Sequence, residues 1–304
     1  MHGWVVYNGH LQSEAFLTFS QWIYDAGKKL GITMEQRKNN EVFVLLEQDK
    51  PLIDTLNYQQ KPDFVVFIDK DIALAKQLEA IGIPVFNSAQ AIATCDNKVD
   101  MYPVLNQASI AIPKTVIAPK IFSKEKAIQL SPFHQLEETF QYPFIIKEGY
   151  GSYGQQVYLI HSREQLDEKI QEIADRPFLF QEFIYSSYGR DLRIYVVGNE
   201  VVAGLARTAQ DDFRANVAIG STVKAHLPTD KEKKLAIDAA QAVGTDFAGV
   251  DLLYDENEEP IVCEVNTSAH IKNIYDYTGV NIAEHIMTWI VKKQMSENNH
   301  FYPH

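Results

Sequence analysis

Near its C-terminal end the chain reads Gly249-Val250-Asp251-Leu252-Leu253 and then, after the polar segment 254–260, Ile261-Val262-Cys263-Glu264-Val265-Asn266. Apolar runs rich in Val, Ile and Leu that flank a polar, proline-bearing segment are typical of a β-hairpin with a longer loop. Because side chains on a strand alternate between its faces, Glu264 and Asn266 point the same way. A register that places Asp251 opposite Glu264 brings these three polar side chains together on one face of the hairpin.

Two carboxylates and an amide oxygen on a rigid hairpin are suitable ligands for Mg²⁺ when phosphate and water oxygens complete its coordination shell. A half-exposed edge hairpin, whose acidic groups are only solvated, is the alternative that this stretch alone leaves open. The other motifs of the chain have to decide between the two.

The bulk properties are those of an ordinary globular protein. The chain has 304 residues, which is enough for two or three sub-domains, with 46% hydrophobic and 22% charged residues. A formal net charge of −12 argues against a general binder of nucleic acid or membrane surfaces. Cys95 and Cys263 are the two cysteines, so a disulfide scaffold is not expected and a reducing compartment is favoured. With no signal-peptide pattern and no membrane-spanning run, we expect a cytoplasmic protein.

The first 87 residues alternate between strand and helix patterns. Alternation of this kind implies parallel βα units, and therefore a small doubly wound domain. A G-x-G-x-x-G fingerprint is missing from its first turn, so dinucleotide binding is not supported. Expected strands lie at 4–7, 42–45, 62–68 and 84–86, and expected helices at 15–30 and 72–81.

The middle of the chain is expected to continue with mixed elements. One helix is predicted over 88–105, with Asp96-Asn97-Lys98 in its middle, and a mostly helical stretch over 122–140 that Pro132 interrupts. Predicted strands follow at 142–148, 156–160 and 178–184, with a helix from Ser162 to about residue 174 that Ser162 caps.

The last third has more β character. Residues 191–207 predict a hairpin with a two-residue turn at Gly198-Asn199. The hairpin of residues 249–266 lies between two predicted helices, at 231–243 and 281–291. Residues 296–304 are expected to form a loose tail.

Two segments carry features of a nucleotide pocket. Lys147 ends a predicted strand and leads into a glycine-rich loop that contains Gly151, Ser152 and Gly154. A lysine there can reach a phosphate, while the flexible loop lets backbone N–H groups approach the phosphates closely. No Gly-Lys-Ser/Thr follows, so this is not a Walker A sequence. Glu182 ends a later strand, where a carboxylate can hold an amine or a ribose hydroxyl; an exposed strand-end acid is the alternative.

Arginines follow in the last third of the chain. Asp191 and Arg193 alternate on one strand face, Arg207 closes the partner strand, and Arg214 precedes Asn216. Because arginine offers a planar fork to carboxylate or phosphate, Arg207 and Arg214 could neutralise a transferring phosphoryl group and a substrate carboxylate. Surface ion pairs of little energetic weight are the alternative for Asp191 and Arg193. Lys98 could likewise be a solvated helix residue or a second phosphate lysine.

The order of these pieces resembles the ATP-grasp superfamily, and within it the RimK-like ribosomal-protein glutamate ligases. The resemblance runs from about residue 88 to 292 and is specific for the fold and the ATP site, much less so for the substrate. It implies a mixed α/β (α+β) fold with a pre-ATP-grasp domain at 1–87, an ATP-grasp N-terminal subdomain at 88–184, a C-terminal subdomain at 185–295 and the tail at 296–304. It rests on Asp96-Asn97-Lys98, Ile112-Pro113-Lys114-Thr115, Ile145-Ile146-Lys147-Glu148, Gln181-Glu182-Phe183-Ile184, Gly189-Arg190-Asp191-Leu192-Arg193, Asp212-Phe213-Arg214-Ala215-Asn216, Ala248-Gly249-Val250-Asp251 and Cys263-Glu264-Val265-Asn266.

The resemblance also implies roles for individual residues. ATP and two Mg²⁺ ions are the expected cofactors, with Mn²⁺ as an alternative metal, and Glu264 is the expected bridging ligand. The implied set is Asp251, Glu264 and Asn266 on the metals; Lys98, Lys147, Gly151, Ser152 and Gly154 on the phosphates; Glu182, Phe183 and Asp191 at the adenosine; and Arg207, Arg214 and Asn216 around the γ-phosphate and acyl group.

This chain departs from the family pattern in two places. The relatives continue the metal motif as Asn-x-Ser-Pro-Gly, whereas this chain reads Asn266-Thr267-Ser268-Ala269-His270. That segment lies on the acceptor side, so it bears on whether glutamate is used, and His270 is expected either to contact substrate or to face solvent. The glycine loop after Lys147 is also shorter.

The function that the resemblance implies is ATP- and Mg²⁺-dependent ligation of a carboxylate to an amine, through an acyl phosphate. The partners would be a small carboxylate and an amino acid, or a peptide or protein acceptor, with no nucleic acid and no membrane; a homo-oligomer is only the base-rate expectation. A kinase that stops after phosphoryl transfer is the alternative reaction. A non-catalytic ATP-binding regulator is the non-enzymatic alternative, and it would be expected to lack part of the metal set.

Overall fold

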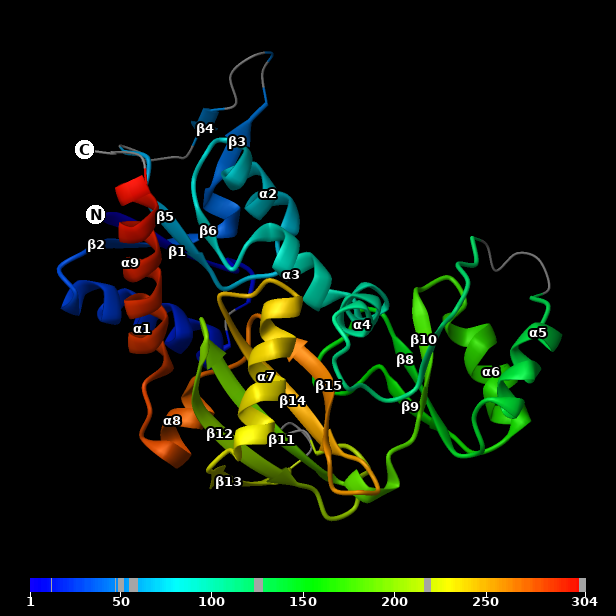
Figure 1. The fold of residues 1–304 in the computed structure, drawn as a ribbon. Helices are drawn as coiled ribbons and strands as arrows, with labels where there is room; N and C mark the ends of the chain where they lie inside the picture. The colour runs from blue at the N-terminus through cyan, green and yellow to red at the C-terminus, as the bar shows by residue number, and fades with distance from the viewer. Residues whose placement is uncertain are drawn as a thin grey trace.

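The computed structural model describes residues 1–11, 13–46, 48, 52–54, 60–122, 128–215 and 220–300. Three larger sheets organise this part of the chain, and a two-stranded ribbon accompanies the first (Figure 1). In these residues no helix is both long and apolar enough to span a bilayer.

The N-terminal sheet is parallel and has the strand order β2-β1-β5-β6. Its central strands are apolar throughout, and Trp4, Val5 and Val66 are fully buried, as expected for a parallel sheet that is covered on both faces. The predicted alternation of strands and helices is therefore confirmed here. The elements are β1 (His2–Tyr7), α1 (Glu14–Lys29), β2 (Thr33–Lys38), β5 (Phe64–Phe67), α2 (Ile72–Ala80) and β6 (Val85–Phe86).

One strand of this sheet was assigned to the wrong stretch. The second strand of the sheet is β2, whereas the predicted strand at 42–45 forms β3 (Phe43–Leu45), which pairs with β4 (Leu52–Asp54) in a separate antiparallel ribbon. β2 reads Thr-Met-Glu-Gln-Arg-Lys and buries Met34 alone. It lies at the edge of the sheet, so its polar sequence lacks the apolar alternation by which a strand is identified.

The second sheet is antiparallel, with the order β7-β10-β8-β9. Its apolar face packs on α6, and the buried aromatic rings of Phe144, Phe178 and Phe180 fill the space between them. At the start of α6, Ser162 accepts a hydrogen bond from Gln165 N, so the predicted cap is present. The elements are β7 (Thr115–Ile117), α5 (Ser131–His134), β8 (Phe144–Glu148), β9 (Val157–Ile160), α6 (Arg163–Ile173) and β10 (Phe178–Glu182).

The third sheet is antiparallel, with the order β13-β12-β11-β14-β15. α7 and α4 (Lys98–Gln107) share a core with one face, while α1, α8 and α9 connect the other face to the N-terminal sheet (Figure 1). Both predicted hairpins are confirmed, and Gly198 adopts φ +59° in the first turn. The elements are β11 (Arg190–Val197), β12 (Glu200–Thr208), β13 (Thr222–His226), α7 (Asp230–Ala242), β14 (Phe247–Tyr254), β15 (Pro260–Asn266), α8 (Lys272–Thr278) and α9 (Ile282–His300).

Three helix predictions need correction. The helix expected over 88–105 is two helices, α3 (Ala89–Asp96) and α4 (Lys98–Gln107), because Asn97 is extended, with φ −110° and ψ 108°. Over 122–140 the described part holds only α5 and a short 3₁₀ turn, since Pro132 starts a new helix rather than continuing one; residues 123–127 lie outside the described ranges. α9 continues to His300, so residues 296–300 are helical and not a loose tail, and 301–304 lie outside the description.

The side chain of Asn87, which follows β6, hydrogen-bonds to the third sheet. Asn87 is fully buried, and its Oδ1 accepts hydrogen bonds from Asp246 N and Phe247 N at 2.6 and 3.1 Å. Its Nδ2 donates to Phe247 O at 2.9 Å. Asn87 therefore satisfies both a donor and an acceptor of β14 that would otherwise be buried without partners.

We expect Asn87→Ala to lower the free energy of unfolding by about 2–4 kcal/mol, because it leaves two buried N–H groups and a buried carbonyl without partners. Urea titration followed by circular dichroism measures the change. Asn106→Ala, at an exposed position late in α4, is the control and should stay within about 0.5 kcal/mol of the wild type. Equal stability of the two variants would show that this joint contributes little.

Candidate functional site

The C-terminal hairpin has the register that the sequence predicts. Asp251 of β14 pairs with Glu264 of β15, and Gly249 pairs with Asn266. Between Asp251 and Leu252 the ladder shifts by one residue, because Cys263 of β15 has no partner on β14 and forms a bulge that redirects the side chains on β15. Asp251 is 5% exposed, whereas Glu264 and Asn266 are half-buried. The hairpin therefore brings two carboxylates and one amide together at adjacent positions.

Asp251 lies between two arginines from neighbouring strands. The Nε and Nη2 of Arg193 donate to its two oxygens at 2.7 Å each, and Arg207 Nη2 lies 3.1 Å from Oδ2. Burial opposes ionisation of Asp251, but the two guanidinium groups outweigh it and hold its pKa below the usual value. Asp251 is thus a carboxylate that the protein keeps ionised.

Arg207 is itself held by Asp191, which faces it across the β11–β12 ladder. Its Nε and Nη2 donate to the two oxygens of Asp191 at 2.6 Å each, and Arg207 is only 3% exposed. The alternative of weak surface pairs for Asp191 and Arg193 is therefore wrong, because both residues take part in one buried network of charges.

Lys98 and Lys147 approach the same hairpin from outside the third sheet. Lys98 Nζ lies 3.2 Å from Glu264 Oε1, and Lys147 Nζ lies 3.7 Å from Cys263 Sγ. Lys147 Nζ also donates to Tyr102 Oη at 3.1 Å. Burial raises the pKa of Cys263 and of Tyr102, so both are neutral neighbours that leave the ammonium charge of Lys147 available to an anion.

The break between α3 and α4 explains how Lys98 reaches the site. Asn97 caps α4 by accepting a hydrogen bond from Val99 N, and Lys98 N donates to Gly149 O at 2.8 Å. A Cβ at Gly149 would lie 2.4 Å from Asn97 Oδ1, so the two segments can approach this closely only with glycine there. The first residue of α4 is thereby fixed beside the start of the glycine loop.

The glycine loop (residues 149–154) contacts the start of α4 and the segment that holds Arg214. Lys98 Nζ donates to Gly151 O at 3.5 Å, and Arg214 Nη1 donates to Gly154 O at 2.6 Å. Ser152 N donates to Gln156 Oε1 at 3.2 Å, which closes the loop on itself. The structure thus places Gly151, Gly154 and Arg214 together, and Asp212 holds the Arg214 side chain through Nε and Nη2.

Glu182 and Phe183 lie at the end of β10. Glu182 Oε1 accepts a hydrogen bond from Lys114 N at 2.6 Å, and Glu182 N donates to Lys114 O at 3.0 Å, so this acid is not simply a solvated strand end. The ring of Phe183 contacts those of Tyr185, Tyr188 and Phe213 edge to face, with centroids 4.7 to 6.1 Å apart. An aromatic surface beside a backbone edge is suited to a planar base.

Sequence reasoning missed several residues of this site. The sequence leaves a surface pair open for Arg193 and gives it no role in the site, and it does not single out Tyr102. Tyr102 Oη donates to the carbonyl of Cys263 at 2.6 Å and accepts from Lys147 Nζ, so it links the two. The sequence gave no signal for Tyr102, because a tyrosine at helical spacing among apolar residues is usually a core residue. Asn216, predicted at the γ-phosphate, lies outside the described residues.

The segment that follows the metal motif contains a group of unpartnered polar atoms. Asn266 Nδ2, Ser268 Oγ and His270 Nδ1 are buried and have no hydrogen-bond partner in the described part of the chain. Buried polar groups normally have partners, so three orphans within five residues indicate a place where a ligand or water binds.

The oxygen atoms of Asp251, Glu264 and Asn266 are chemically suited to bind Mg²⁺. Among the described residues no three His, Cys, Asp or Glu side chains form a metal-binding group, and the hairpin offers two carboxylates plus the Asn266 amide. Most ligands of the ion would therefore be phosphate and water oxygens, as Mg²⁺ accepts readily. The site joins the carboxylates Asp191, Asp251 and Glu264 to the cations Lys98, Lys147, Arg193 and Arg207.

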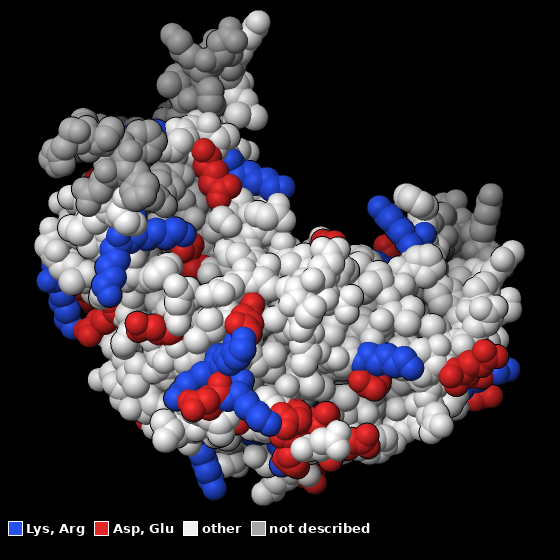
Figure 2. Space-filling view, in the orientation of Figure 1, with Lys and Arg blue, Asp and Glu red and all other residues white. Residues whose placement is uncertain are grey.

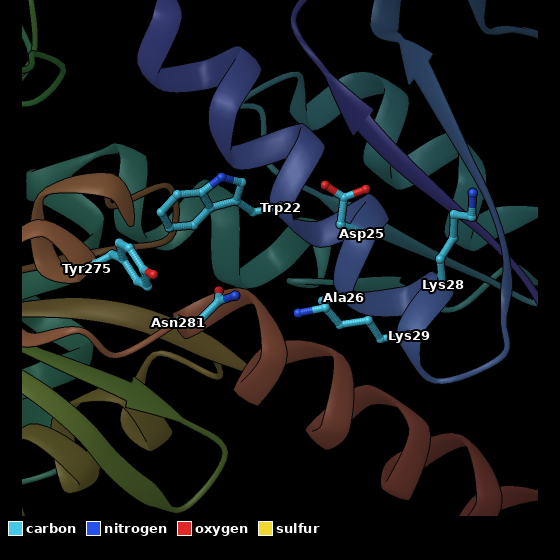
Figure 3. A pocket seen from close by; sticks show the side chains of 7 residues that line it. All are labelled: Trp22, Asp25, Ala26, Lys28, Lys29, Tyr275 and Asn281. Atoms are coloured by element: carbon cyan, nitrogen blue, oxygen red, sulfur yellow. The ribbon is translucent and has the colours of Figure 1, made fainter.

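A cavity of about 660 Å³ opens elsewhere, between α1 and the segment that leads into α9. Figure 3 shows Trp22 and Tyr275 on one side of it, with ring centroids 5.1 Å apart. None of the predicted site residues lines this cavity. On the face shown in Figure 2, basic side chains are interspersed with acidic ones.

Comparisons with known proteins give two sequence matches. Residues 95–290 match the model of the RimK-like ATP-grasp domain. A Coxiella burnetii protein named probable alpha-L-glutamate ligase is 32% identical over 295 residues, which cover 93% of this chain and 94% of that protein.

Solved structures agree on the fold. The ATP-grasp ligase PsnB, complexed with a phosphomimetic variant of its minimal precursor, Mg and ADP, has a TM-score of 0.68 at 18% identity and covers 96% of this chain and 98% of its own. D-alanine–D-alanine ligase from Bacillus anthracis, complexed with ATP, has a TM-score of 0.70 at 13% identity, with coverage of 99% and 100%. The fold of this chain is therefore the ATP-grasp fold.

We expect Arg207→Leu to lower the free energy of unfolding by about 3–5 kcal/mol, because it leaves the buried Asp191 without its partner and Asp251 with one arginine instead of two. Adding Asp191→Asn to this variant should recover part of the loss, since it removes the uncompensated charge. Urea titration measures both variants.

Arg163→Leu is the matched control, because Arg163 forms an exposed pair with Glu137. Its effect should stay below about 1 kcal/mol. If Arg207→Leu behaved like this control, the buried network would not be a stabilising feature.

Proposed function

Because the chain belongs to the RimK-like ATP-grasp family and is an ATP-dependent carboxylate–amine ligase, we propose that it joins an amino acid to the carboxylate of a peptide, protein or small acid through an acyl phosphate. Glutamate is the first amino acid to test, since a relative is named for it. The peptide precursor of PsnB supports including peptides among the acceptors. Two unpaired cysteines fit a reducing compartment such as the cytoplasm.

One observation carries this proposal: two lysines from outside the third sheet converge on the hairpin that holds the carboxylates. Lys98 Nζ is 3.2 Å from Glu264, and Lys147 Nζ is 3.7 Å from Cys263. Cations beside two carboxylates suit a metal-bound polyphosphate. When it binds, Lys98 would exchange Glu264 for a phosphate, and Glu264 would exchange Lys98 for the metal.

The proposed residue roles follow from the contacts. Lys98 and Lys147 bind the phosphates, and the backbone of the 149–154 loop covers them. Glu182 and Phe183 bind the adenosine. Both oxygens of Asp191 accept from Arg207, which supports a role in orienting that arginine rather than in binding adenosine.

Arg207 and Arg214 are proposed to act on the reacting groups. Arg207 uses Nε and Nη2 on Asp191, which leaves Nη1 without a hydrogen-bond partner in the described part of the chain and able to donate to an oxyanion. Arg214 lies at the glycine loop, where it can neutralise a substrate carboxylate or the γ-phosphate.

Asp251, Glu264 and Asn266 would hold the metal, and we propose two Mg²⁺ ions with Glu264 between them and Mn²⁺ as a substitute. When bound, Mg²⁺ neutralises phosphate charge and favours attack on the γ-phosphorus. The carboxylate of the first substrate would attack that phosphorus and release ADP, and the amine would then displace phosphate from the acyl phosphate. Closure of the glycine loop would protect the acyl phosphate from water.

Two alternatives remain as outcomes of a test. A kinase would release ADP without an amine and would form no amide, whereas a ligase needs the amine for product. A non-catalytic regulator would be expected to lack part of the metal set, and this chain retains Asp251, Glu264 and Asn266.

A substrate screen distinguishes these functions. We expect ADP release with ATP and Mg²⁺ to depend on an added amino acid, singly or in pairs, and the product to gain a mass that matches an amide. Silent wells together with saturable Mg-ATP binding would indicate a larger peptide or protein acceptor. Failure to bind Mg-ATP, measured by calorimetry, would contradict the proposal.

We expect Glu264→Gln to reduce ADP formation by about a hundredfold or more, because the amide keeps the shape of the side chain but lacks the charge that the metal needs. ADP release at several Mg²⁺ concentrations measures the loss. Glu256→Gln, an exposed acid in the loop of the same hairpin, is the control and should retain activity. Normal ADP formation by folded Glu264→Gln would remove Glu264 from the metal site.

A further inference from the structure

One contact joins the glycine loop to the segment that follows the metal motif. The hydroxyl of Tyr153 lies 2.9 Å from Nε2 of His270, and the two rings are stacked, with centroids 6.2 Å apart and an interplanar angle of 15°. The two residues are 117 positions apart in the sequence. The contact therefore closes the loop between β8 and β9 onto the third sheet.

His270 is held from two other sides. Its carbonyl accepts a hydrogen bond from the hydroxyl of Tyr195 on β11, and its ring meets Phe16 of α1 edge to face, with centroids 4.8 Å apart. Burial lowers the pKa of His270, and the nearby Arg193 adds to this effect, so the ring is neutral and able to share one proton with the Tyr153 hydroxyl. His270 is therefore the fixed partner of the pair.

Tyr153 is the partner that the loop provides. It is 50% exposed and sits on a loop in which Tyr153 itself has φ +58°, between Gly151 and Gly154 at +153° and +73°. A non-glycine residue in this left-handed region is held there by its surroundings. Lys98 and Arg214 hold the loop by its backbone carbonyls. The Tyr153 side chain adds a contact from the loop to His270.

We propose that His270 and Tyr153 are positioning residues that latch the glycine loop closed over the reacting groups. This inference rests on the proposed function, in which an acyl phosphate has to be kept from water until the amine arrives. The hydrogen bond and the stacked rings keep Gly151 and Gly154 at the phosphate lysine and at Arg214, respectively. Breaking the latch leaves the chemistry intact but opens the site to water.

Hydrogen exchange of the 149–156 backbone tests the latch in the whole protein, with Mg-ADP as the added nucleotide. We expect Tyr153→Phe to speed exchange of this segment about five- to tenfold, because it removes one hydrogen bond and keeps the ring. His270→Leu should do the same, whereas His270→Gln should restore slow exchange by supplying an amide to the hydroxyl.

Tyr150→Phe is the matched control, since it makes the same chemical change at a neighbouring loop tyrosine whose hydroxyl has no hydrogen bond within the described residues. Exchange in this variant should equal that of the wild type. In the amino-acid assay, Tyr153→Phe should form more ADP per amide product than the wild type, a ratio that a merely structural role would not change.

Exchange in Tyr153→Phe that equals the wild type, with or without Mg-ADP, would overturn the latch. The same experiment separates this failure from that of the proposed function. If the wild type shows slow, latch-dependent exchange but calorimetry detects no binding of Mg-ADP, the contact is confirmed while the ligase assignment of the site fails.

Discussion

The buried carboxylate of Asp251 is the constraint on which the site depends. An ionised group that is 5% exposed requires charged partners, and Arg193 and Arg207 supply them from two neighbouring strands. These pairs exist only in the observed register of β11, β12 and β14, because a slip of one residue would turn every side chain to the opposite face. The interaction that holds the central strands together therefore also fixes the carboxylate and arginine positions of the site.

The sequence predicts the features that are local. The period-two pattern of the C-terminal hairpin, the Gly198-Asn199 turn and the cap at Ser162 each depend on residues close in sequence, and each is present. The pairing of Asp251 with Glu264 could be predicted because one hairpin contains both residues. The metal and phosphate roles of the individual residues remain predictions, since the structure shows where the side chains lie and not what they bind.

The features that were missed depend on contacts between distant segments. The helix over 88–105 breaks at Asn97 because Lys98 N donates to Gly149 O, a partner 51 residues away that helical periodicity does not reveal. β2 was missed because an edge strand does not need an apolar pattern. The role of Arg193 needed the register of β11 against β14, which sequence patterns do not specify.

The two halves of the site are built differently, and this bears on how substrates are chosen. Strands and buried ion pairs fix Asp191 and Asp251, so substitutions there also affect the fold. The proposed acceptor side is formed by the segment after β15, where Ser268 Oγ and His270 Nδ1 have no hydrogen-bond partner among the described residues. Loops tolerate change better than buried strands do, so under the proposed function residues 268–270 could vary with the acceptor without disturbing the metal and phosphate contacts. The contact between His270 and Tyr153 joins this segment to the glycine loop, so in the proposed function the acceptor side and the loop over the phosphates are linked to each other as well as to the hairpin.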